Sequence, residues 1–112
     1  MVDDLTKAAA ASLALALADV PEAQRIAGSP RTGAAKLGGF GGINLGVWEM
    51  TPGTMRDIEV DEIFVVLRGA GTVAFEDGSV MQLEPGDVVR LHAGQRTVWT
   101  VTAALRKVYF TL

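Results

Sequence analysis

Few residues in this chain have the chemistry for catalysis or metal binding. The chain contains no cysteine and a single histidine, His92. These counts exclude a disulfide scaffold, a thiolate zinc site and a cysteine nucleophile. With neither a Gly-x-Ser-x-Gly turn nor a second histidine, a Ser-His-Asp triad has little support. The candidates that remain for catalysis are Glu62, Lys107 and Tyr109.

Lys107 and Tyr109 lie two positions apart, which places them on the same face of a strand. In a pocket they could act with Glu62 as an acid/base group. The same spacing also fits a charged pair on an outer face, the commoner arrangement. Trp48 and Trp99 could form a ligand wall, although large aromatic side chains in small β domains are more often core.

The residues from Val47 onward have the pattern of short strands separated by turns. Pro52-Gly53 and Pro85-Gly86 suit type II turns, and Asp77-Gly78 suits a two-residue hairpin turn. This pattern predicts an all-β sandwich or barrel. Strands are expected at Val47–Met50, Val60–Arg68, Gly71–Glu76, Ser79–Leu83, Asp87–Leu91, Thr97–Thr102 and Leu105–Leu112.

The N-terminal part is harder to interpret. Residues 4–18 are rich in Ala and Leu, which favours a helix ending before Pro21, although Leu alternates with small residues from Ser12 to Ala18 as in a strand. This apolar segment needs a cover, either the outside of the barrel or a dimer contact. Residues 19–46 are glycine-rich and are interpreted as a loop, with Ile26, Leu37, Ile43 and Leu45 marking short edge strands.

Size and charge limit the function further. The chain has 112 residues and a net charge of −3, which fits one domain and makes nucleic acid and anionic membranes poor partners. The apolar run Ala8–Ala18 follows Asp3 and Asp4 instead of a basic stretch and is too short to span a bilayer. A cytoplasmic protein is therefore expected.

Two stretches resemble the two motifs of the cupin superfamily. The first is Pro52-Gly53 followed by Asp61–Gly69, and the second is Gly86–Gly94. The ending around Trp99–Val101 and Arg106–Tyr109 is similar to short cupins related to ureidoglycine aminohydrolase and an ethanolamine-utilisation protein. The resemblance covers residues 46–112 and implies a single-domain jelly-roll β-barrel over residues 21–112. Residues 1–20 would form a helical or irregular N-terminal extension.

The resemblance also implies four metal-ligand positions, of which one keeps its ligand. Glu62 matches the family's glutamate, six residues before Gly69. The two histidine positions of the first motif fall on Arg56 and Ile58, or on Met55 and Asp57 with the longer spacing. The last histidine position falls on Thr97, and His92 lies at a proline position. One carboxylate and one hydroxyl are too few for a stable transition-metal site, so no cofactor is expected, with a divalent metal as the less favoured alternative.

An apolar cavity around one carboxylate is expected instead. If Glu62 points inward, Phe64 and Val66 do too, and Thr97 would bring Trp99 and Val101. Asp57, Glu59 and Asp61 are expected mostly in solvent. A buried carboxylate needs a partner, and Arg56 is the first candidate, with Lys107 and Arg96 as the others. Alternatively, Glu62 is a rim residue. The expected cavity residues are Trp48, Arg56, Glu62, Phe64, Thr97 and Trp99.

Two functions remain open. The first is a metal-independent cupin that binds a small molecule or serves as an accessory protein, and that forms a homodimer. The second is an enzyme of nitrogen or amine metabolism, of the aminohydrolase or isomerase kind, that uses the barrel cavity. In the second case Glu62, with Lys107 or Tyr109, would transfer protons.

Overall fold

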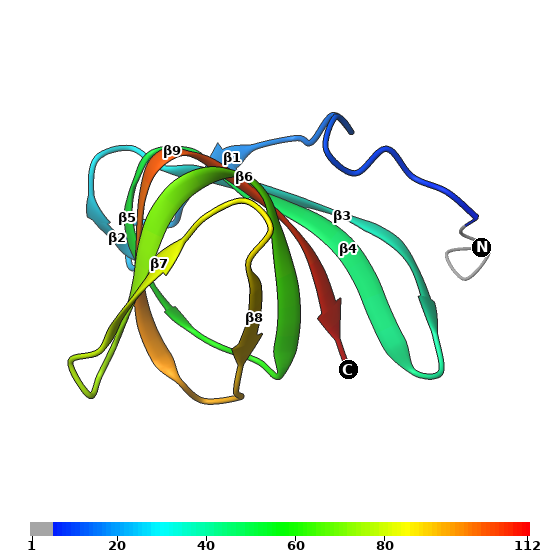
Figure 1. The fold of residues 1–112 in the computed structure, drawn as a ribbon. Helices are drawn as coiled ribbons and strands as arrows, with labels where there is room; N and C mark the ends of the chain where they lie inside the picture. The colour runs from blue at the N-terminus through cyan, green and yellow to red at the C-terminus, as the bar shows by residue number, and fades with distance from the viewer. Residues whose placement is uncertain (1–5) are drawn as a thin grey trace.

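The computed structural model describes residues 6–112, which form one curled antiparallel β-sheet with no helix among them (Figure 1). The two longest strands, β6 (Glu62–Phe75) and β9 (Arg96–Thr111), pair with each other and run through the whole molecule. The other strands are β1 (Ala18–Asp19), β2 (Arg25–Ala27), β3 (Arg31–Phe40), β4 (Ile43–Met50), β5 (Gly53–Ile58), β7 (Val80–Leu83) and β8 (Val88–Leu91). The expected all-β architecture is thereby confirmed.

The sheet has a different strand order at its two ends. At one end β8 pairs with β6, and β6, β9, β4 and β3 follow side by side. At the other end β7 pairs with β6, followed by β9, β5 and β2. The sheet curls around a core whose largest fully buried side chains include Trp99, Phe64 and Met50. The candidate site lies on the inner face, between the β8–β6–β9–β4–β3 end and the β5 strand with the first half of β9.

Two of the expected strand pairs are each one long strand. Val60–Arg68 and Gly71–Glu76 were expected as separate strands, but β6 is continuous with register shifts between Val66 and Gly71. Gly69 lies in this irregular stretch with φ 95°, and a Cβ there would clash with the Ala104 carbonyl oxygen. Glycine therefore lets the strand bend without ending. The two C-terminal strands merge in the same way into β9.

The loop expected over residues 19–46 is wrong for most of its length, whereas the strands expected around Ile26, Leu37, Ile43 and Leu45 are present as β2, β3 and β4. Residues 31–40 and 43–50 form the β3–β4 hairpin, which projects from the curled sheet in Figure 1. Its turn consists of Gly41 and Gly42, with φ 56° and 82°. Consecutive positive φ values suit the type I′ turn that joins antiparallel strands. The glycine run, which read as a flexible loop, supplies the hairpin turn.

The N-terminal helix is also wrong where the structure describes that segment. Residues 6–17 have no regular structure apart from a turn, in which Leu13 N–H donates to the Ala9 carbonyl at 3.0 Å. They lie along the outside of the sheet, where Arg106 Nη1 donates to the carbonyls of Ala10 (3.0 Å) and Leu13 (2.6 Å). Contacts with the sheet therefore override the helix propensity of alanine and leucine. Residues 1–5 of the expected extension lie outside the described part.

Turn chemistry agrees with the sequence at two places. At Glu84-Pro85-Gly86-Asp87, Asp87 N–H donates to the Glu84 carbonyl at 3.0 Å and Gly86 has φ 94°. The Asp87 carboxylate accepts the Glu84 N–H at 2.8 Å, which confirms its expected role in fixing this turn. Between β6 and β7, Gly78 has φ 89° and the Asp77 carboxylate accepts the Ser79 N–H.

Candidate functional site

Strand alternation directs the candidate residues inward from three neighbouring strands. On β6, Glu62, Phe64 and Val66 are buried, as expected if Glu62 points inward. On β9, Thr97, Trp99 and Val101 are buried as expected from Thr97. The register places Trp48 of β4 opposite Lys107 and Phe64 opposite Tyr109.

A buried ion pair occupies the middle of this inner face. Lys107 Nζ lies 2.6 Å from Glu62 Oε2, and the two side chains are 6% and 9% exposed. Taking either charge out of water alone is costly, so each is retained because the other lies within hydrogen-bond distance. Lys107 was one of the alternative partners considered for Glu62. The commoner expectation, that Lys107 and Tyr109 form an outer-face pair, is wrong.

Three aromatic rings surround the same ammonium group. Lys107 Nζ lies 4.3 Å from the ring centroid of Phe64, 4.7 Å from that of Trp48 and 4.8 Å from that of Trp99. An ammonium over an aromatic face is attracted by the ring quadrupole, by about 0.5–2 kcal/mol per contact. The rings and Glu62 together hold the cation where water cannot solvate it.

A second carboxylate is fixed beside the pair. Glu59, 7% exposed, accepts hydrogen bonds at Oε2 from Thr97 Oγ1 at 2.6 Å and from Trp99 Nε1 at 3.0 Å. Main-chain bonds from Glu59 N–H to the Gln95 carbonyl and from Gly94 N–H to the Glu59 carbonyl fix the loop that carries it. Thr97, at a position where cupins place a histidine, therefore holds a carboxylate.

Arg56 does not take part in the site, which corrects the expected Arg56–Glu62 pair. No ion pair within 4.0 Å joins these two residues, both of which the structure describes. On β5, Met55 is buried and Asp57 is partly buried, while Arg56 and Ile58 are exposed. Alternation thus puts Met55 and Asp57, the longer-spacing frame, on the inner face and turns Arg56 outward. Arg96, the third candidate partner, lies near Glu76 instead, at 3.6 Å.

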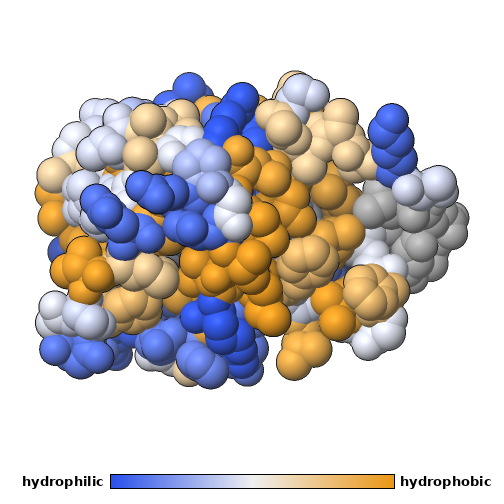
Figure 2. Space-filling view, viewed as in Figure 1, coloured by the Kyte–Doolittle hydropathy of each residue, from blue (hydrophilic) through white to orange (hydrophobic). Residues whose placement is uncertain are grey.

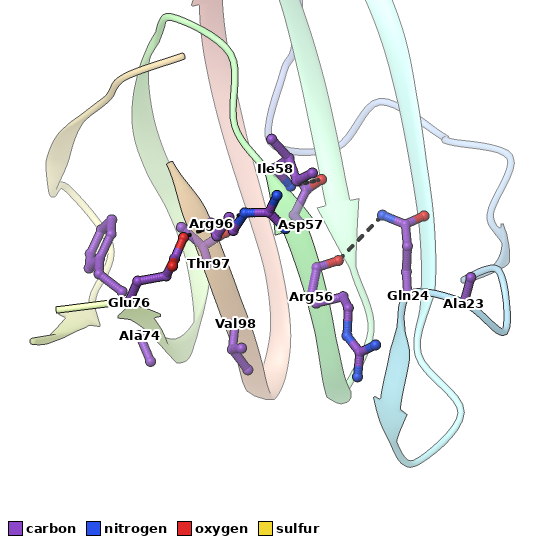
Figure 3. Close-up of a pocket in the computed structure, with 11 residues that line it drawn as sticks. Ala23, Gln24, Arg56, Asp57, Ile58, Ala74, Glu76, Arg96, Thr97 and Val98 are labelled. Atoms are coloured by element: carbon purple, nitrogen blue, oxygen red, sulfur yellow. Dashed lines mark hydrogen bonds and ion pairs between the residues drawn. The ribbon is translucent and has the colours of Figure 1, made fainter. Parts of the chain in front are cut away.

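Arg56 lies in an outer groove of about 510 Å³ (Figure 3). Its main-chain carbonyl accepts a hydrogen bond from Gln24 Nε2 at 3.3 Å, and its guanidinium extends in the other direction. The Arg96–Glu76 pair in this groove has side chains that are 67% and 70% exposed. Such exposed pairs contribute little binding energy, so the groove is a weaker candidate than the inner face.

The inner face opens to a cavity of about 350 Å³. Of the described residues that line it, Lys107 alone is basic, and Asp57, Glu59 and Glu62 are acidic. Burial, and then the negative charge of Glu59, raise the pKa of Asp57 above its usual 3.8. Burial, and then the charge of Glu62, raise the pKa of the Tyr109 phenol above 10.0. The expectation that Asp57 and Glu59 point to solvent is therefore wrong.

The other expected cavity residues divide between lining and core. Trp48 and Trp99 line the cavity, and Trp99 is also core, being 1% exposed. Tyr109, expected as a catalytic candidate and not as a cavity residue, lines it too. Phe64 is fully buried beneath the ammonium and Thr97 is buried against Glu59. His92 is exposed in the turn after β8, with its main-chain N–H bonded to Gln95 Oε1. Within residues 6–112 no group of three or more His, Cys, Asp or Glu side chains could hold a metal ion.

One polar cluster on the outer face of the sheet was not expected from the sequence. Glu49 Oε1 accepts hydrogen bonds from Arg106 Nε and from Arg68 Nη2, both at 2.8 Å. Burial opposes ionisation of Glu49, but these two guanidinium groups hold its pKa below the usual 4.5. In the β4–β9 register Glu49 lies opposite Arg106, one residue along from the Trp48–Lys107 pair. The cluster could have been predicted only if this register had been known. The cluster fastens the N-terminal segment to the sheet.

Comparisons with known proteins agree with this fold. The family model of the EutQ-like cupin domain matches residues 37–109. A putative ethanolamine utilization protein Q from Salmonella typhimurium is 23% identical, with a TM-score of 0.62 over 70% of this chain and 67% of its own. The EutQ protein of Clostridium difficile is 21% identical, with a TM-score of 0.64 over 82% and 78%.

A protein of unknown function from Pseudomonas syringae is 24% identical, with a TM-score of 0.70 over 89% of this chain. The present chain spans 45% of that protein's length. No curated protein matches the chain. No helix in residues 6–112 is long and apolar enough to cross a membrane.

Proposed function

The chain belongs to the EutQ-like cupin domain family, and we propose that it is a metal-independent cupin that binds a small organic molecule inside the curled sheet. The observation that carries the proposal is the Lys107–Glu62 pair. The glutamate that would ligate a metal in this fold has an ammonium group 2.6 Å away. The positive charge that balances Glu62 therefore comes from the chain itself.

The lining of the cavity suggests the charge of its ligand. When all groups are ionised, three carboxylates face one ammonium, so the cavity is net negative. Trp48 and Tyr109 add aromatic faces, which also favour cations. We therefore expect the ligand to be a small organic cation, such as a primary amine. The Salmonella neighbour is named for ethanolamine utilization, but at 23% identity this likeness supports the fold alone.

Thermal shift of the chelator-treated protein tests the proposal with matched pairs of opposite charge. Ethanolamine is compared with glycolate and benzylamine with benzoate, because a ligand that binds the native state raises the melting temperature. We expect the amines to raise it and the acids not to do so, and we expect EDTA not to change the melting temperature of the untreated protein. Asp57→Asn should reduce the shift, whereas Asp77→Asn, in an exposed turn away from the cavity, should not. Stabilisation by none of the four, or only with added Mn²⁺ or Zn²⁺, would contradict the proposal.

An enzyme of amine metabolism is the second candidate. It is favoured by the position of Tyr109, which lines the same cavity as Lys107 and Glu62 and could transfer protons with them. Elemental analysis separates the two candidates. About one Mn, Ni, Fe or Zn ion per purified chain would favour the metal chemistry of the enzyme. Turnover of an amine by metal-free protein, lost in Tyr109→Phe, would support an enzyme of another kind.

A further inference from the structure

Lys107 is in different surroundings from the other lysines of the chain, Lys7 and Lys36. Those two are exposed, whereas the Lys107 side chain is 6% exposed and lines the inner cavity. An amine in water is protonated and hydrated, and in that form it is a poor nucleophile. A lysine that is held out of water beside a base can lose its proton and attack a carbonyl carbon. Lys107 is therefore the lysine of this chain that is placed for covalent chemistry.

The ammonium of Lys107 has more hydrogen-bond donors than its site has acceptors. It carries three N–H groups, and within residues 6–112 the one oxygen acceptor for them is Glu62 Oε2, at 2.6 Å. On its other sides lie the rings of Phe64, Trp48 and Trp99, with centroids 4.3–4.8 Å from Nζ. A protonated imine, which an amine forms with an aldehyde, keeps the positive charge but has a single N–H. That N–H matches the single acceptor.

We propose that Lys107 forms a Schiff base with a small aldehyde that enters the inner cavity. Glu62 accepts a proton from the ammonium, and the neutral amine attacks the carbonyl carbon to form a carbon–nitrogen bond. A proton moves from nitrogen to oxygen, which gives a carbinolamine. Its carbon–oxygen bond then breaks, and the hydroxyl leaves as water with the proton that Glu62 returns. The product is a protonated imine with Glu62 as its counter-ion, and the reaction needs no oxidant or reductant.

The ion pair provides the base for the first step. Proton transfer from Lys107 to Glu62 converts two buried charges into two neutral groups, and burial disfavours charged groups. The two atoms lie within hydrogen-bond distance, so the transfer needs no rearrangement. The positive charge returns to the same nitrogen in the imine, where the three rings already favour a cation.

The lining of the cavity selects the class of aldehyde. Asp57, Glu59 and Glu62 lie in its wall, so an aldehyde that carries a carboxylate is repelled. Trp48 and Trp99 offer aromatic surface to an apolar tail. The volume of about 350 Å³ admits a small molecule. The substrate class is therefore a small uncharged aldehyde, aliphatic or aromatic.

The sheet shields Lys107 from its other side, so these preferences apply to any aldehyde that reaches Nζ. Figure 2 shows hydrophobic residues gathered over β6, β8 and the end of β9. Ile63 and Val88 belong to this outer surface and are 45% and 69% exposed. Lys107 lies on the inner face together with Glu62, and an aldehyde approaches it from the cavity.

Reductive trapping tests the proposal within one molecule. Cyanoborohydride reduces an imine to a stable secondary amine, so each lysine that has formed a Schiff base with benzaldehyde gains a benzyl group. Peptide mass spectrometry after a limited reaction at neutral pH compares the three lysines of the folded chain. We expect Lys107 to be labelled at least about tenfold faster than Lys7 or Lys36, because Glu62 and the cavity hold the reactants together. Labelling of Lys107 that is no faster than that of the exposed lysines would overturn the proposal.

Two controls show whether the cavity causes the preference. In denaturing urea the three lysines should be labelled at similar rates, and a preference for Lys107 that persists there would overturn the proposal. In the folded protein, para-carboxybenzaldehyde should label Lys36 as benzaldehyde does but label Lys107 more slowly; equal labelling of Lys107 by both would contradict the selection by the cavity lining. This proposal and the binding of amines can fail separately, because benzaldehyde carries no charge and amine binding forms no covalent bond.

Discussion

At the scale of single residues, the account depends on one buried lysine. Lys107 is 5% exposed, and Glu62 and three aromatic rings satisfy its charge. Removing one member of a buried ion pair leaves the other charge without a partner, which costs far more than losing the pair as a unit. In the sequence, the one feature that distinguishes Lys107 from an exposed lysine is its spacing, two residues from both Leu105 and Tyr109, which puts all three on the same strand face.

Lys107→Met should therefore lower the free energy of unfolding by about 3–5 kcal/mol, because Glu62 is left buried without its cation. The double variant Lys107→Met with Glu62→Leu should recover most of that loss, since apolar residues of similar volume can replace a buried pair. Arg96→Met, which breaks an exposed pair, should cost less than about 1 kcal/mol. Urea denaturation measures all three. A loss in Lys107→Met as small as that in Arg96→Met would contradict the buried pair.

Asp57 should make amine binding depend on pH. Its pKa is raised by burial and by Glu59, so the carboxylate takes up a proton at a higher pH than an exposed aspartate does. A cation is attracted by the ionised form alone. The affinity for benzylamine should thus be full above the raised pKa and fall as the pH drops through it. Titration calorimetry over this acidic range measures how the affinity for benzylamine changes with pH, and this pH dependence should become weaker in Asp57→Asn. If it is unchanged in Asp57→Asn, another group causes the effect.

At the scale of elements, the N-terminal segment is attached to the sheet by polar bonds. Arg106 donates from Nε to Glu49 and from Nη1 to two carbonyls of residues 6–17. The forked guanidinium makes these bonds at once, which a lysine cannot do. The segment has no regular structure of its own, so these bonds are a large part of what orders it.

Arg106→Lys should therefore release the segment while leaving the barrel folded. Amide hydrogen exchange at residues 12 and 13, whose N–H groups bond to the Ala9 carbonyl, should become faster, and exchange in β6 and β9 should change little. Arg96→Lys, on the same strand but in the exposed pair with Glu76, is the matched control and should behave like wild type. Equal protection of residues 12 and 13 in both variants would show that the Arg106 bonds do not hold the segment.

The sequence predicted the elements with a clear period and missed those decided by tertiary contacts. The C-terminal strands and the Pro-Gly and Asp-Gly turns follow from local chemistry. The alanine-rich segment does not, because its conformation is set by Arg106 and the sheet surface. The β3–β4 hairpin was missed because glycines in a run signal a loop, unless strand pairing on both sides is known.

The site was predicted in part for the same reason. Once Glu62 and Thr97 were assumed to point inward, strand alternation correctly placed Phe64 and Trp99 on the same inner face. The face of β5 could not be assigned, because the two ligand spacings of the first motif differ by one residue. A shift of one residue exchanges the two faces of a strand. Because the spacing that applies to β5 was not known, Arg56 was expected to pair with Glu62, and Asp57 was expected to face solvent.

At the scale of the whole molecule, the curled sheet separates two surfaces with different roles. The inner face holds charges and aromatic rings around a cavity of about 350 Å³, and the outer face of β4 and β9 holds the Glu49–Arg106 cluster that attaches residues 6–17. β4 and β9 contribute to both surfaces, because Trp48 and Lys107 face the cavity while the adjacent Glu49 and Arg106 lie on the outer face.

Lys107 supplies the positive charge beside Glu62, so binding in the cavity should not need a metal. A calorimetric titration of the chelator-treated protein with benzylamine, repeated after one equivalent of Mn²⁺ or Zn²⁺ is added, tests this expectation. The account predicts one binding event per chain of equal affinity in both titrations, and none with benzoate. Binding that appears after the metal is restored, and not before, would contradict it.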